Sequence, residues 1–170
     1  EIRDPDTAHT AVRAALTGHL VFSTLHANTA VGATHALMNM GVPAYLLASS
    51  ASGIVAQRLV RVIHEGCKEE VKPAGGLLKE LGLAAKTRKK FYSGAGCDVC
   101  FQTGYLGRTG LLEVVEVREQ LRRAIMEHQS QDEMTAIVAA KSVPMRDAGL
   151  AKMHAGVTTA AEVLKAVALQ

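Results

Sequence analysis

The sequence predicts an α/β fold that carries a small metal-binding subdomain and ends in a helical segment. A helical pattern that Asp4 or Asp6 would cap runs to about Leu16, and the short β-branched stretch 19–25 (HLVFSTL) follows it. We expect this stretch to be a buried strand, because helix, glycine and strand in this order are typical of an α/β unit with parallel strands. Cys and His pairs lie in the middle of the chain, and the residues from 118 onward have helical periodicity.

Composition excludes several classes of protein. The 170 residues suit one domain or two small ones, and 48% of them are hydrophobic while only 4% are aromatic. A net charge of +3 is too small for a typical nucleic-acid-binding domain. The odd count of 3 cysteines argues against a disulfide framework and for metal binding in a reducing compartment. Since we find neither a signal peptide nor an apolar run long enough to span a bilayer, we expect a cytoplasmic protein.

The first half of the chain contains two further helices and a strand. A helix over 29–40 begins near Asn28, a good N-cap, and ends at the Gly41-Val42-Pro43 break. A second helix spans about 43–50. The β-branched run 54–63 (IVAQRLVRVI) predicts a strand.

The middle and the end of the chain differ in composition. Residues 65–96 are charged, with a short helix predicted at 76–81 and a basic run at 86–90, whereas 111–117 (LLEVVEV) alternates like a half-exposed strand. The remaining sequence predicts helices over 118–128, 131–140, 144–154 and 159–168, with Ser130 and Glu133 forming a capping box. We therefore divide the chain into residues 1–63, 64–112 and 113–170.

Three cysteines and one histidine have the spacing of a zinc site. Each of the two pairs has two residues between its members, and the four residues are His64, Cys67, Cys97 and Cys100. Thiolate and imidazole are ligands that Zn²⁺ prefers, and four protein ligands leave no open position for water, so we predict a structural ion. Glu65 or Asp98 remains an alternative to His64 as the fourth ligand. The glycines at 66, 94, 96 and 104 would supply the tight turns.

Several motifs resemble the secretion ATPases of type II secretion and type IV pilus assembly. The resemblance covers nearly the whole chain and rests on EIRD at 1–4, TGHLVFSTLHAN at 17–28, AQRLVR at 56–61, GCDVC at 96–100, GRTG at 107–110 and GVTT at 156–159. It implies that residues 1–63 are the C-terminal part of a RecA-like P-loop ATPase core. Residues 64–112 would be the zinc-binding subdomain, and 113–170 a small helical C-terminal domain.

The same resemblance implies a function and its residues. Members of this family are cytoplasmic homohexamers at the inner membrane, where they bind ATP and Mg²⁺ and work with an inner-membrane platform protein and other secretion or pilus components. Glu1 matches the Walker B glutamate, which activates the attacking water, and His26 matches the histidine box, whose histidine lies near the γ-phosphate. We expect peripheral membrane association and no nucleic-acid partner.

The chain departs from the family pattern at three points, and two of them bear on function; the third, in residues 145–149, carries no functional claim. His64 stands where the family usually has cysteine, so a Cys₃His site is expected. The presence of a zinc subdomain at this place in the chain favours an assembly motor over a retraction motor. The phosphate-binding pattern GxxxxGK followed by Ser or Thr is absent from the 170 residues. Because Glu1 also begins the chain in the middle of a pattern, we expect a fragment of a longer protein that is inactive alone.

Two other functions compete with the motor fragment. The CxxC spacing at Cys97 and Cys100 is similar to that in the zinc repeats of DnaJ-type chaperones, although those repeats are denser in CxxC. The basic run 86–90 beside Phe91 and Tyr92 would suit a zinc-stabilised nucleic-acid-binding module, although stacking surfaces usually have more widely spaced aromatic residues.

Overall fold

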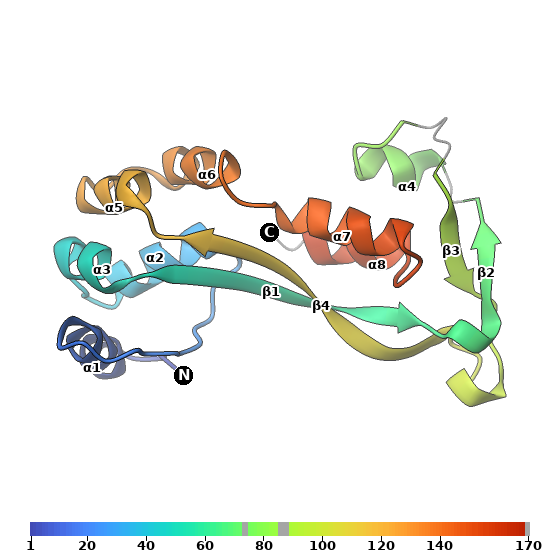
Figure 1. Cartoon of the computed structure of the whole chain (residues 1–170), viewed down its shortest axis with the longest axis horizontal. Coiled ribbons are helices and arrows are strands. Elements are labelled where there is room, and N and C mark those ends of the chain that lie inside the picture. The colour runs from blue at the N-terminus through green and yellow to red at the C-terminus, as the bar shows by residue number, and fades with distance from the viewer. Residues whose placement is uncertain (73–74, 85–88, 169–170) are drawn as a thin grey trace. The chain divides into compact units, whose positions relative to one another are not determined.

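The computed structural model describes residues 1–72, 75–84 and 89–168 (Figure 1). In chain order its elements are α1 (Pro5–Leu16), α2 (Ala30–Asn39), α3 (Ala44–Ser50), β1 (Gly53–Ile63), the 3₁₀ turn η1 (Glu65–Cys67), β2 (Lys68–Val71), α4 (Gly75–Glu80), β3 (Phe91–Gly94), the 3₁₀ turn η2 (Asp98–Cys100), β4 (Tyr105–Glu116), α5 (Glu119–Met126), α6 (Gln131–Ala139), α7 (Met145–His154) and α8 (Ala160–Val167). Among the described helices, none has the length and hydrophobicity needed to cross a membrane.

The strands form two antiparallel pairs. β1 pairs with β4, and β2 pairs with β3 in a register that places Lys68 opposite Gly94. At one end of the first pair the Val117 N–H donates to the Ser52 carbonyl at 3.0 Å, and at the other end the His64 N–H donates to the Gly104 carbonyl at 3.0 Å. The start of β1 therefore lies beside the end of β4, so the prediction of parallel strands is wrong for the described residues.

Packing divides the chain into two compact units. Unit 1 comprises residues 1–56 and 113–143, and unit 2 comprises residues 57–112 and the C-terminal segment from Pro144. Each unit contains one part of β1 and one part of β4. The division of the chain into residues 1–63, 64–112 and 113–170 remains a prediction.

The predicted buried strand at 19–25 is wrong. This segment is extended but exposed, with Leu20 80% and Phe22 88% accessible, and no described strand pairs with it. The Ile2 N–H donates to the Thr24 carbonyl at 2.7 Å, and the His19 N–H at the start of the segment donates to the Ala14 carbonyl at 3.1 Å. β-Propensity describes how a side chain fits a half-buried pleated surface, so a β-branched run without ladder partners does not become a strand.

The predicted helices are confirmed with small shifts at their ends. Asp4 caps α1 by accepting a hydrogen bond from the Thr7 N–H at 2.8 Å. Thr29, and not Asn28, caps α2, because its hydroxyl oxygen accepts from the Gly32 N–H at 2.9 Å. The capping box of α6 is present, and β4 begins at Tyr105, well before the predicted start at 111.

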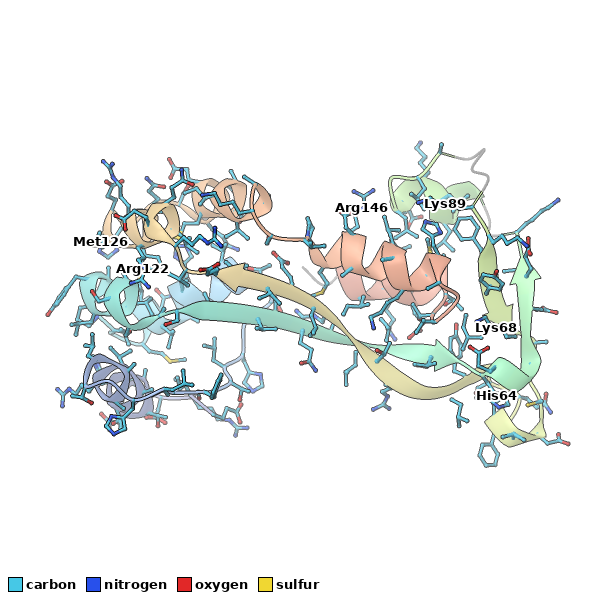
Figure 2. The ribbon with its side chains drawn as sticks, viewed as in Figure 1. His64, Lys68, Lys89, Arg122, Met126 and Arg146 are labelled. Carbon is cyan, nitrogen blue, oxygen red and sulfur yellow. The ribbon has the colours of Figure 1, made fainter. Side chains whose placement is uncertain are left out.

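In unit 1, Arg122 on α5 holds the C-terminal end of α3 (Figure 2). Its guanidinium donates to the carbonyl oxygens of Ala48 at 2.9 Å and Ala51 at 3.3 Å, and to that of Val117 at 2.9 Å. The last carbonyls of a helix have no partner within the helix, so these bonds satisfy groups that would otherwise remain unpaired. The two helices that this arginine joins contribute buried residues to unit 1: Leu47 from α3, and Leu121, Ala124 and Ile125 from α5.

In unit 2, Arg61 joins β1 to α8 and β4. Its guanidinium donates to the Glu162 carboxylate at 2.8 Å, and its backbone N–H donates to the other oxygen at 2.9 Å. The same guanidinium lies 4.0 Å from the ring centroid of Tyr105, whose hydroxyl is 2.9 Å from the Thr159 hydroxyl. The hydrogen bonds from Arg61 lower the pKa of Glu162, although burial opposes them. Glu162 is therefore a buried carboxylate with a full set of partners.

We expect Arg122→Ala to destabilise unit 1 by about 1–3 kcal/mol, because it leaves buried helix-end carbonyls without donors. Hydrogen exchange of the α3 amides measures this effect locally. Arg123→Ala is the matched control, since the neighbouring Arg123 forms a 2.7 Å pair with Glu127 at the surface and should contribute less than about 1 kcal/mol. Equal exchange rates in the two variants would contradict the capping role.

We expect Glu162→Gln to lower the free energy of unfolding of unit 2. We also expect that free energy to fall less steeply on acidification than in the wild type. A carboxyl whose pKa is lowered by folding stabilises the native state above its unfolded pKa, and this contribution is lost as the pH falls through the folded pKa. The wild type should therefore lose more stability than the variant on acidification below about pH 4.5. Urea unfolding followed by circular dichroism measures this, with Glu70→Gln on the exposed Lys90–Glu70 pair as control. Parallel pH profiles for wild type and Glu162→Gln would refute it.

Candidate functional sites

The four predicted zinc ligands converge at one end of the β1–β4 pair. His64 follows the last residue of β1, Cys67 ends η1, Cys97 precedes η2 and Cys100 ends it. Their ligand atoms all lie within 4.8 Å of one another. Figure 2 marks His64 at this end of the strand pair. We call these four residues the Cys₃His cluster.

The spacing of the cluster fits an ion and not a disulfide. His64 Nδ1 lies 3.3 Å from Cys97 Sγ, and Cys100 Sγ lies 3.7 Å from Cys97 Sγ and 3.9 Å from Cys67 Sγ. A tetrahedral ion with metal–sulfur bonds of about 2.3 Å separates its sulfur ligands by about 3.8 Å, whereas a disulfide brings them to about 2.05 Å. All three cysteines are free.

Backbone amides surround the sulfur of Cys100. The N–H groups of Cys97 and Gly104 donate to Cys100 Sγ at 3.2 and 3.3 Å. Burial raises the pKa of the Cys100 thiol, but hydrogen bonds from these amides and from the Cys97 and Cys67 side chains together lower that pKa to about 6, whereas burial raises the pKa of Cys67. The local backbone thus favours the thiolate of Cys100, the form in which cysteine binds metal.

Two glycines let the cluster close. A Cβ on Gly94 would collide with the backbone of Gly104, and Gly104 itself has a φ of +75°, in the left-handed region. The end of β3 and the segment before β4 therefore approach closely, and beside them the His64 N–H reaches the Gly104 carbonyl and the Ala95 N–H reaches the Cys67 carbonyl at 2.8 Å. Side chains at either glycine would force the ligand loops apart.

The two carboxylates considered as alternative ligands have other partners. Glu65 is 76% exposed and accepts a hydrogen bond from Lys68 at 3.1 Å. Asp98 accepts a hydrogen bond from the Gln102 side-chain amide at 3.0 Å. The geometry therefore favours His64 as the fourth ligand, which stays a prediction.

Among the residues that suggested nucleic-acid binding, those that the structure describes have partners within the chain. Residues 86–88 of the basic run lie outside the described residues, and Lys90 pairs with Glu70 at 2.8 Å. Phe91 is 5% exposed and packs into the apolar cluster of unit 2, while Tyr92 has the Lys68 ammonium 5.1 Å from its ring centroid. Phe91 cannot stack on a base without leaving the core.

The two predicted catalytic residues lie against each other in unit 1. His26 Nε2 is 2.9 Å from one carboxylate oxygen of Glu1, and Arg3 Nη2 is 2.6 Å from the other. The bond between the Ile2 N–H and the Thr24 carbonyl brings the two segments together, and Ile2 is buried. Glu1 is 31% exposed and His26 is 85% exposed, so water can reach the carboxylate.

Electrostatics keep Glu1 ionised. The hydrogen bond from Arg3, and after it the neighbouring His26, lower the pKa of the Glu1 carboxyl. An ionised, partly exposed carboxylate can orient a water molecule and accept its proton. His19 instead makes local contacts, with Nδ1 3.1 Å from the Thr17 hydroxyl and 3.2 Å from the Ala14 carbonyl.

Arg3 was not among the predicted site residues. Its signal in the sequence is weak: residues i and i+2 of an extended segment point to the same side, so the Glu-x-Arg spacing allows a contact without requiring it.

Comparison with known proteins decides the family. The family model described as "Type II/IV secretion system protein" matches residues 1–165. The chain belongs to this family. It is 44% identical over 165 residues to the type II secretion system protein E of Pseudomonas aeruginosa and 42% identical over 167 residues to the type IV pilus assembly ATPase PilB of Thermus thermophilus. The recognition made from the motifs is confirmed.

Solved structures of secretion ATPases have the same fold as this type II/IV secretion system protein. The ATPase DotB of Yersinia pseudotuberculosis superposes with a TM-score of 0.66 at 17% identity, covering 100% of this chain and 36% of that one. The pilus retraction motor PilT superposes with a TM-score of 0.62 at 22% identity, covering 98% of this chain and 37% of that one. The predicted fold class, α/β as in the RecA-like secretion ATPases, is confirmed.

The relatives are much longer than this chain. The match covers 97% of the chain but 33% of the Pseudomonas protein, and 96% of the chain but 19% of the Thermus protein. The chain thus spans about a third or less of the relatives it matches.

Proposed function

We propose that this chain is the C-terminal portion of a hexameric, cytoplasmic ATPase that powers type IV pilus assembly or type II secretion. The observation that carries the proposal is the contact between Glu1 and His26, two residues distant in sequence that the family resemblance had assigned to one site. The names of the relatives, which include secretion and pilus assembly ATPases, support it. Its partners would be an inner-membrane platform protein and other secretion or pilus components, with the motor peripheral to the inner membrane.

The residues of this chain supply the water-activating half of the site. The ionised Glu1 would take a proton from the attacking water, and His26 would hold the carboxylate oriented while its exposed ring faces the phosphate side. ATP with Mg²⁺ would bring the phosphoryl group. Because the phosphate-binding pattern is absent from these 170 residues, the chain alone should bind and hydrolyse ATP poorly.

We further propose that the Cys₃His cluster binds one structural Zn²⁺. The donor set and the 3.3–3.9 Å spacings suit that ion, and four protein ligands leave no place for a reactive water. Three thiolates and one neutral imidazole carry a net charge of −1 with the ion, which is easier to bury than the −2 of four thiolates. In this family a zinc subdomain favours an assembly motor.

A chimera tests the ATPase proposal. Residues 1–165 of this chain replace the matching third of the Pseudomonas type II secretion system protein E, and phosphate release is measured. We expect the chimera to hydrolyse ATP and Glu1→Gln to lower its rate by about 10²–10⁴-fold, the contribution of a general base. Glu116→Gln, at an exposed carboxylate of β4, is the control. A folded chimera without activity, or full turnover by the 170-residue chain alone, would contradict the proposal.

Metal analysis tests the zinc proposal. The purified chain should contain one zinc, and His64→Ala should lower its zinc affinity by at least about tenfold, since loss of even an outer-shell partner of a ligand has effects of that size. His128→Ala, an exposed histidine outside the cluster, should leave affinity unchanged. Unchanged affinity in His64→Ala would remove that residue from the ligand set, and a loss in Glu65→Ala would assign the carboxylate in its place.

A further inference from the structure

Both oxygens of the Glu1 carboxylate are held, each by a different donor. Arg3 Nη2 lies 2.6 Å from Oε2, and His26 Nε2 lies 2.9 Å from Oε1. A carboxylate has about four lone-pair sites, so one acceptor site on each oxygen remains for water. Arg3 therefore does not block the carboxylate; it fixes the plane in which the remaining sites point.

The two donors differ in what they can do. A guanidinium is always charged and holds a carboxylate with a rigid fork, whereas an imidazole changes its charge near neutral pH. Arg3 is consequently the partner of Glu1 whose charge does not change with pH. Among the described residues, the charged and titratable side chains paired with Glu1 are those of Arg3 and His26.

The local backbone makes the Arg3 contact possible. Ile2 is 7% exposed, which anchors the segment, and Glu1 and Arg3 on either side of it point the same way. Asp4 then caps α1, so the backbone of Arg3 is fixed between a buried residue and a helix cap.

We propose that Arg3 is a positioning residue for the hydrolysis reaction, acting through Glu1 and not through the phosphates. The proposal rests on the proposed ATPase function of the longer protein. Arg3 orients the carboxylate and keeps it in the ionised form, at the cost of some basicity. Its removal leaves Glu1 mobile and more readily protonated, so that a smaller fraction of the base is competent at a given acidic pH.

The chain contains a matched control for this pair. Arg118 lies 2.6 Å from Glu116 with the same Glu-x-Arg spacing around a buried residue, Val117, and both side chains are 63% exposed. Removing Arg118 deletes an equivalent surface ion pair that is remote in sequence from Glu1 and His26. An effect shared by the two arginine variants therefore reports on stability or surface charge, and one confined to Arg3 reports on Glu1.

The experiment measures kcat and KM for ATP against pH in the chimera described above, with Arg3→Gln, Arg3→Lys and Arg118→Gln. We expect Arg3→Gln to lower kcat about tenfold, a part of the contribution of a general base, and to keep KM within about twofold. Its acidic limb should move to higher pH, because the hydrogen bond that lowers the pKa of Glu1 is gone. The kcat and the acidic limb of Arg3→Lys should lie between those of Arg3→Gln and the unsubstituted chimera. Arg118→Gln should match the unsubstituted chimera in both.

Two results would overturn the inference while leaving the ATPase proposal intact. A raised KM with an unmoved acidic limb would mean that Arg3 binds phosphate directly, and an unchanged kcat profile would mean that the pair is incidental. If instead the unsubstituted chimera is inactive, or Glu1→Gln retains full activity, the ATPase proposal itself fails and the role of Arg3 fails with it.

Discussion

The antiparallel pairing of β1 with β4 is the constraint on which the remaining structure depends. Both compact units contain residues of these two strands, and the ladder fixes which residues meet at each of its ends. Its bond from the His64 N–H to the Gly104 carbonyl places the first metal ligand beside the loop that carries the last two. At the other end the same ladder places Val117 beside Ser52, which follows α3. The Val117 carbonyl there accepts a hydrogen bond from Arg122. A slip of one residue would turn each of these side chains to the opposite face.

The two candidate sites are held in different ways. The Cys₃His cluster is organised by backbone atoms: amides point at Cys100, and two glycines allow the strands to approach. The Glu1 site is organised by side chains from two segments that the backbone bond from the Ile2 N–H to the Thr24 carbonyl brings together. The first arrangement is suited to a permanent structural ion, and the second leaves the carboxylate accessible to water.

Local signals made most of the fold predictable. Caps such as Asp4 and the Ser130–Glu133 box define helix starts through bonds within four residues, and the paired Cys and His spacing defined the cluster. The errors concern partners that are distant in sequence. Residues 19–25 have strand composition, but whether they form a strand depends on a neighbour, and the glycines at 107 and 110 hid the early start of β4. The roles of Arg3 and Arg122 are likewise visible only once the chain is folded, because each is defined by the acceptors it meets.

The apposition of Gly94 and Gly104 has a consequence for how this region can vary. Each glycine leaves no room for even a methyl group on the other, because the atom in the way is backbone and cannot be trimmed by mutation. A substitution at one position therefore has no compensating substitution at the other, unlike a large-for-small exchange between two packed side chains. Any side chain at either position would therefore displace the backbone beside the cluster, whichever residue supplies the fourth ligand.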